Sequence, residues 1–129
     1  MTYYTESAHM HILTFKAASA IGKGCAVKAD TSNLEPYVAI AGDGETAIGL
    51  TLEAATAVGQ PIKVCLGGVC IGKANAAITY GESVNSAAAT GKIDTAGAAE
   101  HALGYALGTA TAQDDEIPVL ISHHVTAAG

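Results

Sequence analysis

The feature that most constrains the fold of this chain is an internal repeat. Residues 47–66 align without a gap on residues 102–121. Matching residues occur throughout the two segments: Gly49 and Gly104, Leu52 and Leu107, Thr56 and Thr111, Ile62 and Ile117, and Val64 and Val119. Each copy has a strand of small residues, a short turn and a strand of alternating apolar residues, which is the pattern of a β-hairpin. Two copies about 55 residues apart are too few for a solenoid, which needs roughly three. The repeat therefore predicts an all-β domain with internal pseudo-symmetry, a small β-barrel or a sandwich-like domain of short strands.

Composition limits the core that such a domain can build. The chain has 129 residues, which suits one domain, and 50% of them are hydrophobic. Only 5% are aromatic and tryptophan is absent, so alanine supplies much of the apolar content. Small side chains bury less apolar surface on folding. Contact with copies of itself or with a larger partner would supply the missing burial.

The charge balance narrows the class of partner. Six basic residues, all of them lysine, stand against 12 acidic residues, which gives a net charge of −6. Nucleic-acid binding gains from clustered Lys and Arg, so we expect no nucleic-acid partner. The sequence has no apolar run long enough for a membrane span, and its beginning lacks the pattern of a signal peptide. We therefore expect no membrane association, and production in a host cytoplasm.

The chain divides into an arm, a domain and a tail. Residues 1–16 are predicted to form an N-terminal arm that includes most of a first strand at 11–17. Residues 17–125 form a single β-rich domain, and residues 126–129 form a loose tail. Further short strands are expected at 25–29, 37–41, 47–52, 62–66, 69–71, 83–84, 92–94 and 116–123.

A glycine pair places two cysteines opposite each other. Gly67 and Gly68 suit a two-residue primed turn, which needs positive φ at both positions. In that hairpin Cys65 lies opposite Cys70, where a cross-strand disulfide could form on oxidation. The alternative, which an odd total of three cysteines favours, is a pair of small apolar residues in the core.

No group of residues in the sequence indicates catalysis or metal binding. His9 and His11 fall on one face of a strand, but a metal ion would need further ligands. A pH-sensitive subunit contact is the remaining functional reading of the histidines. Asp114–Glu116 is interpreted as a solvated loop tip rather than a cation site. Because no nucleophile with a base and no phosphate-binding loop occurs, we predict no enzyme activity and no cofactor.

The order of the glycine-punctuated strands resembles that of a known group of proteins. The segments that carry the resemblance are 21–27, 47–52, 62–71, 81–84, 102–107 and 117–121. In this order they are similar to the capsid cement or head decoration proteins of tailed bacteriophages. The resemblance covers residues 17–122 and rests on patterns of Gly, Ala and Val.

This resemblance implies a structural protein of the virion. Such proteins bind the outer surface of an assembled icosahedral head, contact its major capsid protein, commonly as trimers, and stabilise the shell. Several use an N-terminal arm to reach neighbouring capsid subunits. The residues assigned to capsid binding here are the larger side chains of the arm and its histidines: Tyr3, Tyr4, His9, His11 and Phe15. A terminus without any contact is the alternative for this segment.

Two other functions remain open. One is a soluble β-domain that binds a small ligand or a sugar, for which Tyr37, Tyr80 and Tyr105 are the aromatic residues outside the arm. The other is a structural module of a phage tail or fibre. Copy number per particle separates them, because a cement protein covers a whole lattice whereas a fibre occurs in few copies.

Overall fold

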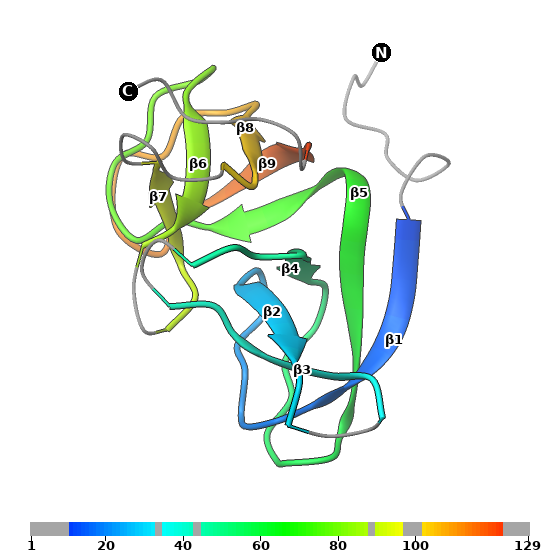
Figure 1. Cartoon of the computed structure of the whole chain (residues 1–129). Coiled ribbons are helices and arrows are strands. Elements are labelled where there is room, and N and C mark those ends of the chain that lie inside the picture. Colours follow the sequence, from blue (N-terminus) through cyan, green and yellow to red (C-terminus); the bar gives the residue numbers. More distant parts are fainter. Residues whose placement is uncertain (1–10, 33–34, 43–44, 88–89, 97–101, 123–129) are drawn as a thin grey trace.

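The chain folds into β-strands joined by short loops. The computed structural model describes residues 11–32, 35–42, 45–87, 90–96 and 102–122, and every regular element in these ranges is a β-strand. The strands are β1 (His11–Ala17), β2 (Ala26–Asp30), β3 (Tyr37–Ile40), β4 (Gly49–Thr51), β5 (Pro61–Lys73), β6 (Ser83–Ser86), β7 (Ile93–Thr95), β8 (Gly104–Ala106) and β9 (Glu116–Ile121) (Figure 1). The all-β prediction is confirmed.

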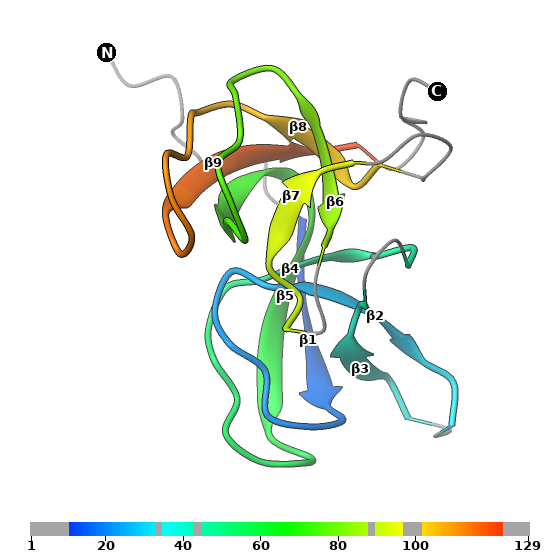
Figure 2. The ribbon, with the colours of Figure 1, turned by 90° about the vertical axis from the view of Figure 1, so that its left-hand side faces the viewer.

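Strand β5 joins two halves of the molecule. Its residues 61–67 pair with β1 and β4, whereas its residues 68–73 pair with β9. We call β1–β4 with residues 61–67 the first module, and residues 68–73 with β6–β9 the second module. Figure 2 shows the two modules one above the other, with β5 passing between them. The described part of the chain is thus assembled from two small β units.

Both modules use the same strand pairings. In the first, the order β1-β3-β2-β4-β5 closes through the pairing of β1 with β5, which gives a five-stranded mixed barrel. In the second, the order is β5-β9-β8-β6-β7, and the last gap is bridged by Ala74 and Ile93. The register is also repeated, because Leu50 pairs with Cys65 and its counterpart Tyr105 pairs with Leu120.

The repeat is longer than the ungapped alignment indicates. Ile21 bridges Ala55 in the first module, and Ile78 bridges Ala110 in the second. The pattern Ile-x-x-Gly-x-x-Val occurs at both places, at residues 21–27 and 78–84. The β6–β7 hairpin pairs Val84 with Thr95, whereas its counterpart pairs Val27 with Ile40, so the second hairpin is two residues shorter and an alignment without gaps loses the match upstream of it. The sequence therefore contains the longer repeat, but an alignment must allow a gap to detect it.

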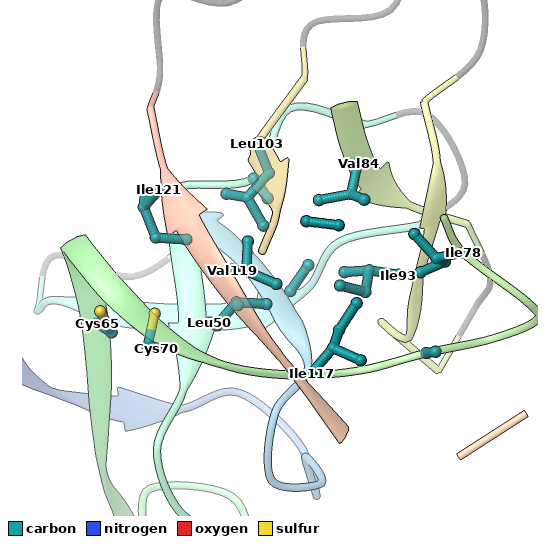
Figure 3. Packing of buried hydrophobic residues seen from close by; sticks show 14 of the residues in the cluster. Leu50, Cys65, Cys70, Ile78, Val84, Ile93, Leu103, Ile117, Val119 and Ile121 are labelled. Atoms are coloured by element: carbon teal, nitrogen blue, oxygen red, sulfur yellow. The ribbon is translucent and has the colours of Figure 1, made fainter. Parts of the chain in front are cut away.

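Equivalent apolar residues fill the two modules. In the first, the core consists of Ala17, Ile21, Cys25, Val27, Val38, Ala55, Ile62 and Val64. The second has the counterparts of most of these, including Ala74, Ile78, Val84, Ile93, Ala110, Ile117 and Val119, and most of its larger members are labelled in Figure 3. Ala26, Leu50 and Cys65 of the first module belong to this second cluster. The second core is therefore completed by residues of the first module.

The predicted tight turn at Gly67–Gly68 is wrong. Strand β5 continues through both glycines, from Pro61 to Lys73, and Gly68 has a φ of 86°. Positive φ is accessible to glycine at little cost, so the pair bends the strand from one module into the other instead of reversing it. Pairing partners on both sides of the bend, β1 before it and β9 after it, favour this path.

Candidate functional site

Among the strands of the first module, the first half of β1 has the most exposed large apolar side chains. The side chains of Ile12 and Leu13 are 43% and 56% exposed, although successive residues of a strand point to opposite faces. Here β1 pairs with β5 on one side, and its described pairing with β3 begins only at Lys16. Exposed apolar side chains beside an unpaired strand edge are typical of a surface that binds a partner.

Two of the residues assigned to capsid binding lie in this strand. The His11 side chain is exposed at the beginning of β1, beside Gly67 of the bend. Phe15 is half-buried and packs against the core of the first module. Tyr3, Tyr4 and His9 lie outside the described residues. Phe15 is thus positioned as a core residue, whereas Ile12 and Leu13, which the assignment did not include, are exposed beside it.

A shallow apolar hollow lies at one end of the first module. Its lining residues are Thr46, Ala47, Ile48 and Leu66, and its volume is about 430 Å³. Ile48 and Leu66 are half-buried and pack against the core beneath. Because the hollow is wide open and offers few polar groups, it suits an apolar side chain of another protein better than a small polar ligand.

The three tyrosines considered for sugar stacking do not share a module. Tyr37 is half-buried on β3, whereas Tyr80 and Tyr105 are 63% and 38% exposed on the second module. Tyr37 therefore lies on a different module from Tyr80 and Tyr105, and the three do not form one aromatic surface.

The structure brings Cys65 and Cys70 together by a route other than the predicted hairpin. Both are buried free thiols, and their sulfurs lie side by side across the bend of β5 (Figure 3). The Cys65 thiol donates to the carbonyl of Gly67, with 3.2 Å between sulfur and oxygen. The hydrogen bond with Cys65, together with burial, raises the pKa of the Cys70 thiol. The same hydrogen bond lowers the pKa of the Cys65 thiol. Burial keeps both sulfurs away from solvent, and the pair packs between the modules.

The acidic loop between β8 and β9 is organised as a turn. Oδ2 of Asp115 accepts hydrogen bonds from the backbone N and Oγ1 of Thr111, at 2.8 and 3.1 Å, and from the backbone N of Ala112. These bonds hold the pKa of Asp115 below its usual range. Asp114 pairs instead with Lys92, at 2.6 Å.

The carboxylates of this loop therefore do not converge on a common point. In the part of the chain that the structure describes, no cluster of three or more His, Cys, Asp or Glu side chains could hold a metal ion. Within the same residues, no helix is long and apolar enough to cross a membrane.

Comparison with known proteins shows similarity of structure but not of sequence. No known protein-family profile matches the sequence, and no curated protein matches it. Among solved structures, the chain is similar to the N base of the head fiber protein gp8.5 of bacteriophage phi29, with a TM-score of 0.73. The match covers 89% of this chain and 96% of that one, at 14% sequence identity. The two chains share a fold over most of their lengths.

Proposed function

We propose that this chain is a structural protein of a phage head that binds the outer surface of the capsid and stabilises the shell. The observation that carries the proposal is the shared fold with a phage head fiber base, which extends over 96% of that chain. The strand order that resembles head decoration proteins supports it from the sequence. Under this proposal the partner is the major capsid protein and the location is the capsid exterior of the virion. Nucleic acid and membranes are not partners.

The contact with the shell is assigned to β1 and to the arm that precedes it. Ile12 is exposed, and between residues 12 and 15 the edge of β1 that faces away from β5 has no described partner. Such an edge can add to a sheet of another protein through backbone hydrogen bonds. We expect Tyr3, Tyr4, His9 and His11 to extend this contact.

Stabilisation of the shell follows from mass action. A protein that binds the assembled shell but not its free subunits shifts the equilibrium towards assembly. Repetition over a lattice allows each single contact to be weak, because linked sites raise the overall affinity. From the resemblance we expect a homotrimer on the head.

A second function, the base of a head fibre, is favoured by the description of the structural neighbour. A base anchors a further segment to the shell and need not reinforce it. The two functions differ in whether the bound protein raises the temperature or denaturant concentration at which heads disassemble.

Co-sedimentation with expanded heads that lack this protein tests the proposal. We expect saturable binding of the full chain, with a copy number that follows the symmetry of the shell. Removal of residues 1–10, or Ile12→Lys, should weaken binding by tenfold or more, about 1.4 kcal/mol. Val58→Lys is the matched control, because Val58 is 70% exposed and lies outside β1. Absence of binding by the folded full chain would refute the proposal.

A further inference from the structure

Within one chain, the two modules meet through two different faces. The first module contributes an outer face, which includes Leu50 and Cys65, and the second module contributes a receiving face, against which these residues pack. On the first module, Leu50 lies 3.3 Å from the point where a Cβ at Gly72 would stand, and Cys65 contacts Cys70. Beside them, the backbone N of Lys73 donates to the carbonyl of Gly24, at 2.9 Å. The outer face of the first module is thereby covered by the second.

Among the described residues, the second module carries the same outer face without a cover. The counterparts of Leu50 and Cys65 are Tyr105 and Leu120, which are 38% and 37% exposed. The counterpart of Gly24 is Gly81, and no described atom lies within 4 Å of a Cβ built there, whereas Gly24 contacts Lys73. Tyr80, next to Gly81, is 63% exposed. We call Tyr80, Tyr105 and Leu120 the docking face.

The first module carries the same receiving face, and within the described residues no other module packs over it. In the second module this face consists of Cys70, Gly72, Leu103 and Ile121, and all of these residues are buried. Their counterparts in the first module are Leu13, Phe15, Ile48 and Leu66, of which Leu13 is 56% exposed and the others are half-buried. Ile48 and Leu66 also line the hollow of about 430 Å³. We call Leu13, Phe15 and Ile48 the receiving face.

Each chain therefore holds one filled interface and two unpaired halves of the same kind of interface. We propose that the docking face of one copy binds the receiving face of a second copy, head to tail. By analogy with the contact of Cys65 and Cys70, Leu120 packs against Leu13 of the neighbouring copy. Tyr105 packs over Phe15 in place of the contact between Leu50 and Gly72.

The contact between copies is shallower than the one within the chain. Phe15 fills the space that Gly72 leaves open for Leu50 in the second module. The backbone N of Lys16, the counterpart of Lys73, already donates to the carbonyl of Pro36, at 3.0 Å. It is therefore not free to donate to a neighbouring copy as the backbone N of Lys73 donates to Gly24. The contact then rests on apolar side chains alone, and we expect it to be reversible and dependent on protein concentration.

A head-to-tail contact uses two different surfaces of the same chain. Repetition of such a contact produces a closed ring if the rotation closes and an open chain if it does not. A ring of three copies would agree with the trimer expected from the resemblance. The contact does not require the capsid, so it stands or fails separately from the proposed function.

Sedimentation velocity of the full chain over a range of concentrations, without heads, tests the inference. We expect the sedimentation coefficient to rise with concentration. Leu120→Asp and Leu13→Asp, one on each face, should each abolish the rise, and Val58→Asp, an exposed control, should not. All three side chains are exposed, so unfolding curves should stay close to those of the unchanged protein.

A mixing experiment separates the proposed contact from a symmetric one. The Leu120→Asp variant keeps its receiving face and the Leu13→Asp variant keeps its docking face, so an equimolar mixture should form one-to-one dimers although neither variant associates alone. A contact between two identical faces would leave one of the variants able to associate by itself. That result, or a sedimentation coefficient of the full chain that does not change with concentration, would overturn the proposal.

Discussion

Replacement of Gly49 or Gly104 by alanine should disrupt a close contact between neighbouring strands. The contact at Gly49 lies in the first module, and its counterpart at Gly104 lies in the second. A Cβ at Gly49 would stand closer than 3.0 Å to the carbonyl oxygen of Cys65, and a Cβ at Gly104 would stand closer than 3.0 Å to that of Leu120. In both cases the obstacle is the backbone of the neighbouring strand, which cannot turn aside as a side chain can. Strand β4 or β8 would have to move away from its partner.

The expected cost follows from the short length of these strands. Each has three residues, so a displacement weakens most of its ladder. Two lost backbone hydrogen bonds cost about 1–3 kcal/mol, and overpacking costs a further 1–3 kcal/mol or so. We therefore expect Gly49→Ala and Gly104→Ala each to lower the free energy of unfolding by about 2–6 kcal/mol, which is a large part of the stability of an ordinary domain.

Urea unfolding followed by circular dichroism measures this loss. The control is Gly22→Ala, because a Cβ there would lie 3.4 Å from Sγ of Cys25, an ordinary contact, and should change the free energy by less than about 0.5 kcal/mol. The two core variants should lose similar amounts, since the residues are counterparts. A loss below about 1 kcal/mol for either variant would refute the reasoning from repeated geometry.

Three further predictions concern the loop, the thiols and the module interface. Asp115→Ala should destabilise the protein at pH 7, and Asp115→Asn less so because the acceptor remains. Since the pKa of Asp115 is lowered on folding, its contribution is present above about pH 4 and is lost as the pH falls through the folded-state pKa, so unfolding curves of Asp115→Ala and the unchanged protein should converge in acid. Cys65 and Cys70 should resist alkylation in the folded protein and react only on unfolding, and mass spectrometry of protein labelled before and after denaturation checks this. Leu50→Ala should cost about 2–5 kcal/mol, measured by urea unfolding, because Leu50 is fully buried between the modules.

The sequence predicted the class of fold and part of its symmetry because both depend on local patterns. Alternating apolar residues and the equivalence of Gly49 with Gly104 identified the last two strands of each module. The first strands were harder to match. Phe15 in β1 corresponds to Gly72 in β5, and these residues share no chemistry, since one fills its own module while the other admits Leu50 of its neighbour.

The path of β5 could not be predicted from local sequence. A glycine pair between two apolar segments favours a tight turn, and only the strands that lie on both sides of the bend decide that β5 continues. The nearness of Cys65 and Cys70 was predicted, but for the wrong reason. The exposed residues Ile12 and Leu13 were missed as surface residues because alternation along a strand assigns one of them to the interior, and only the position of β1 at the end of the barrel exposes both.

The most direct test of the central claim, that this chain binds the outside of a phage head, is an electron cryomicroscopy reconstruction of heads incubated with the full chain. The account predicts added density on the outer surface of the shell, with the two modules resolved and the β1 end of the first module against the major capsid protein. Heads that show no added density at saturating protein, or density inside the shell, would contradict it.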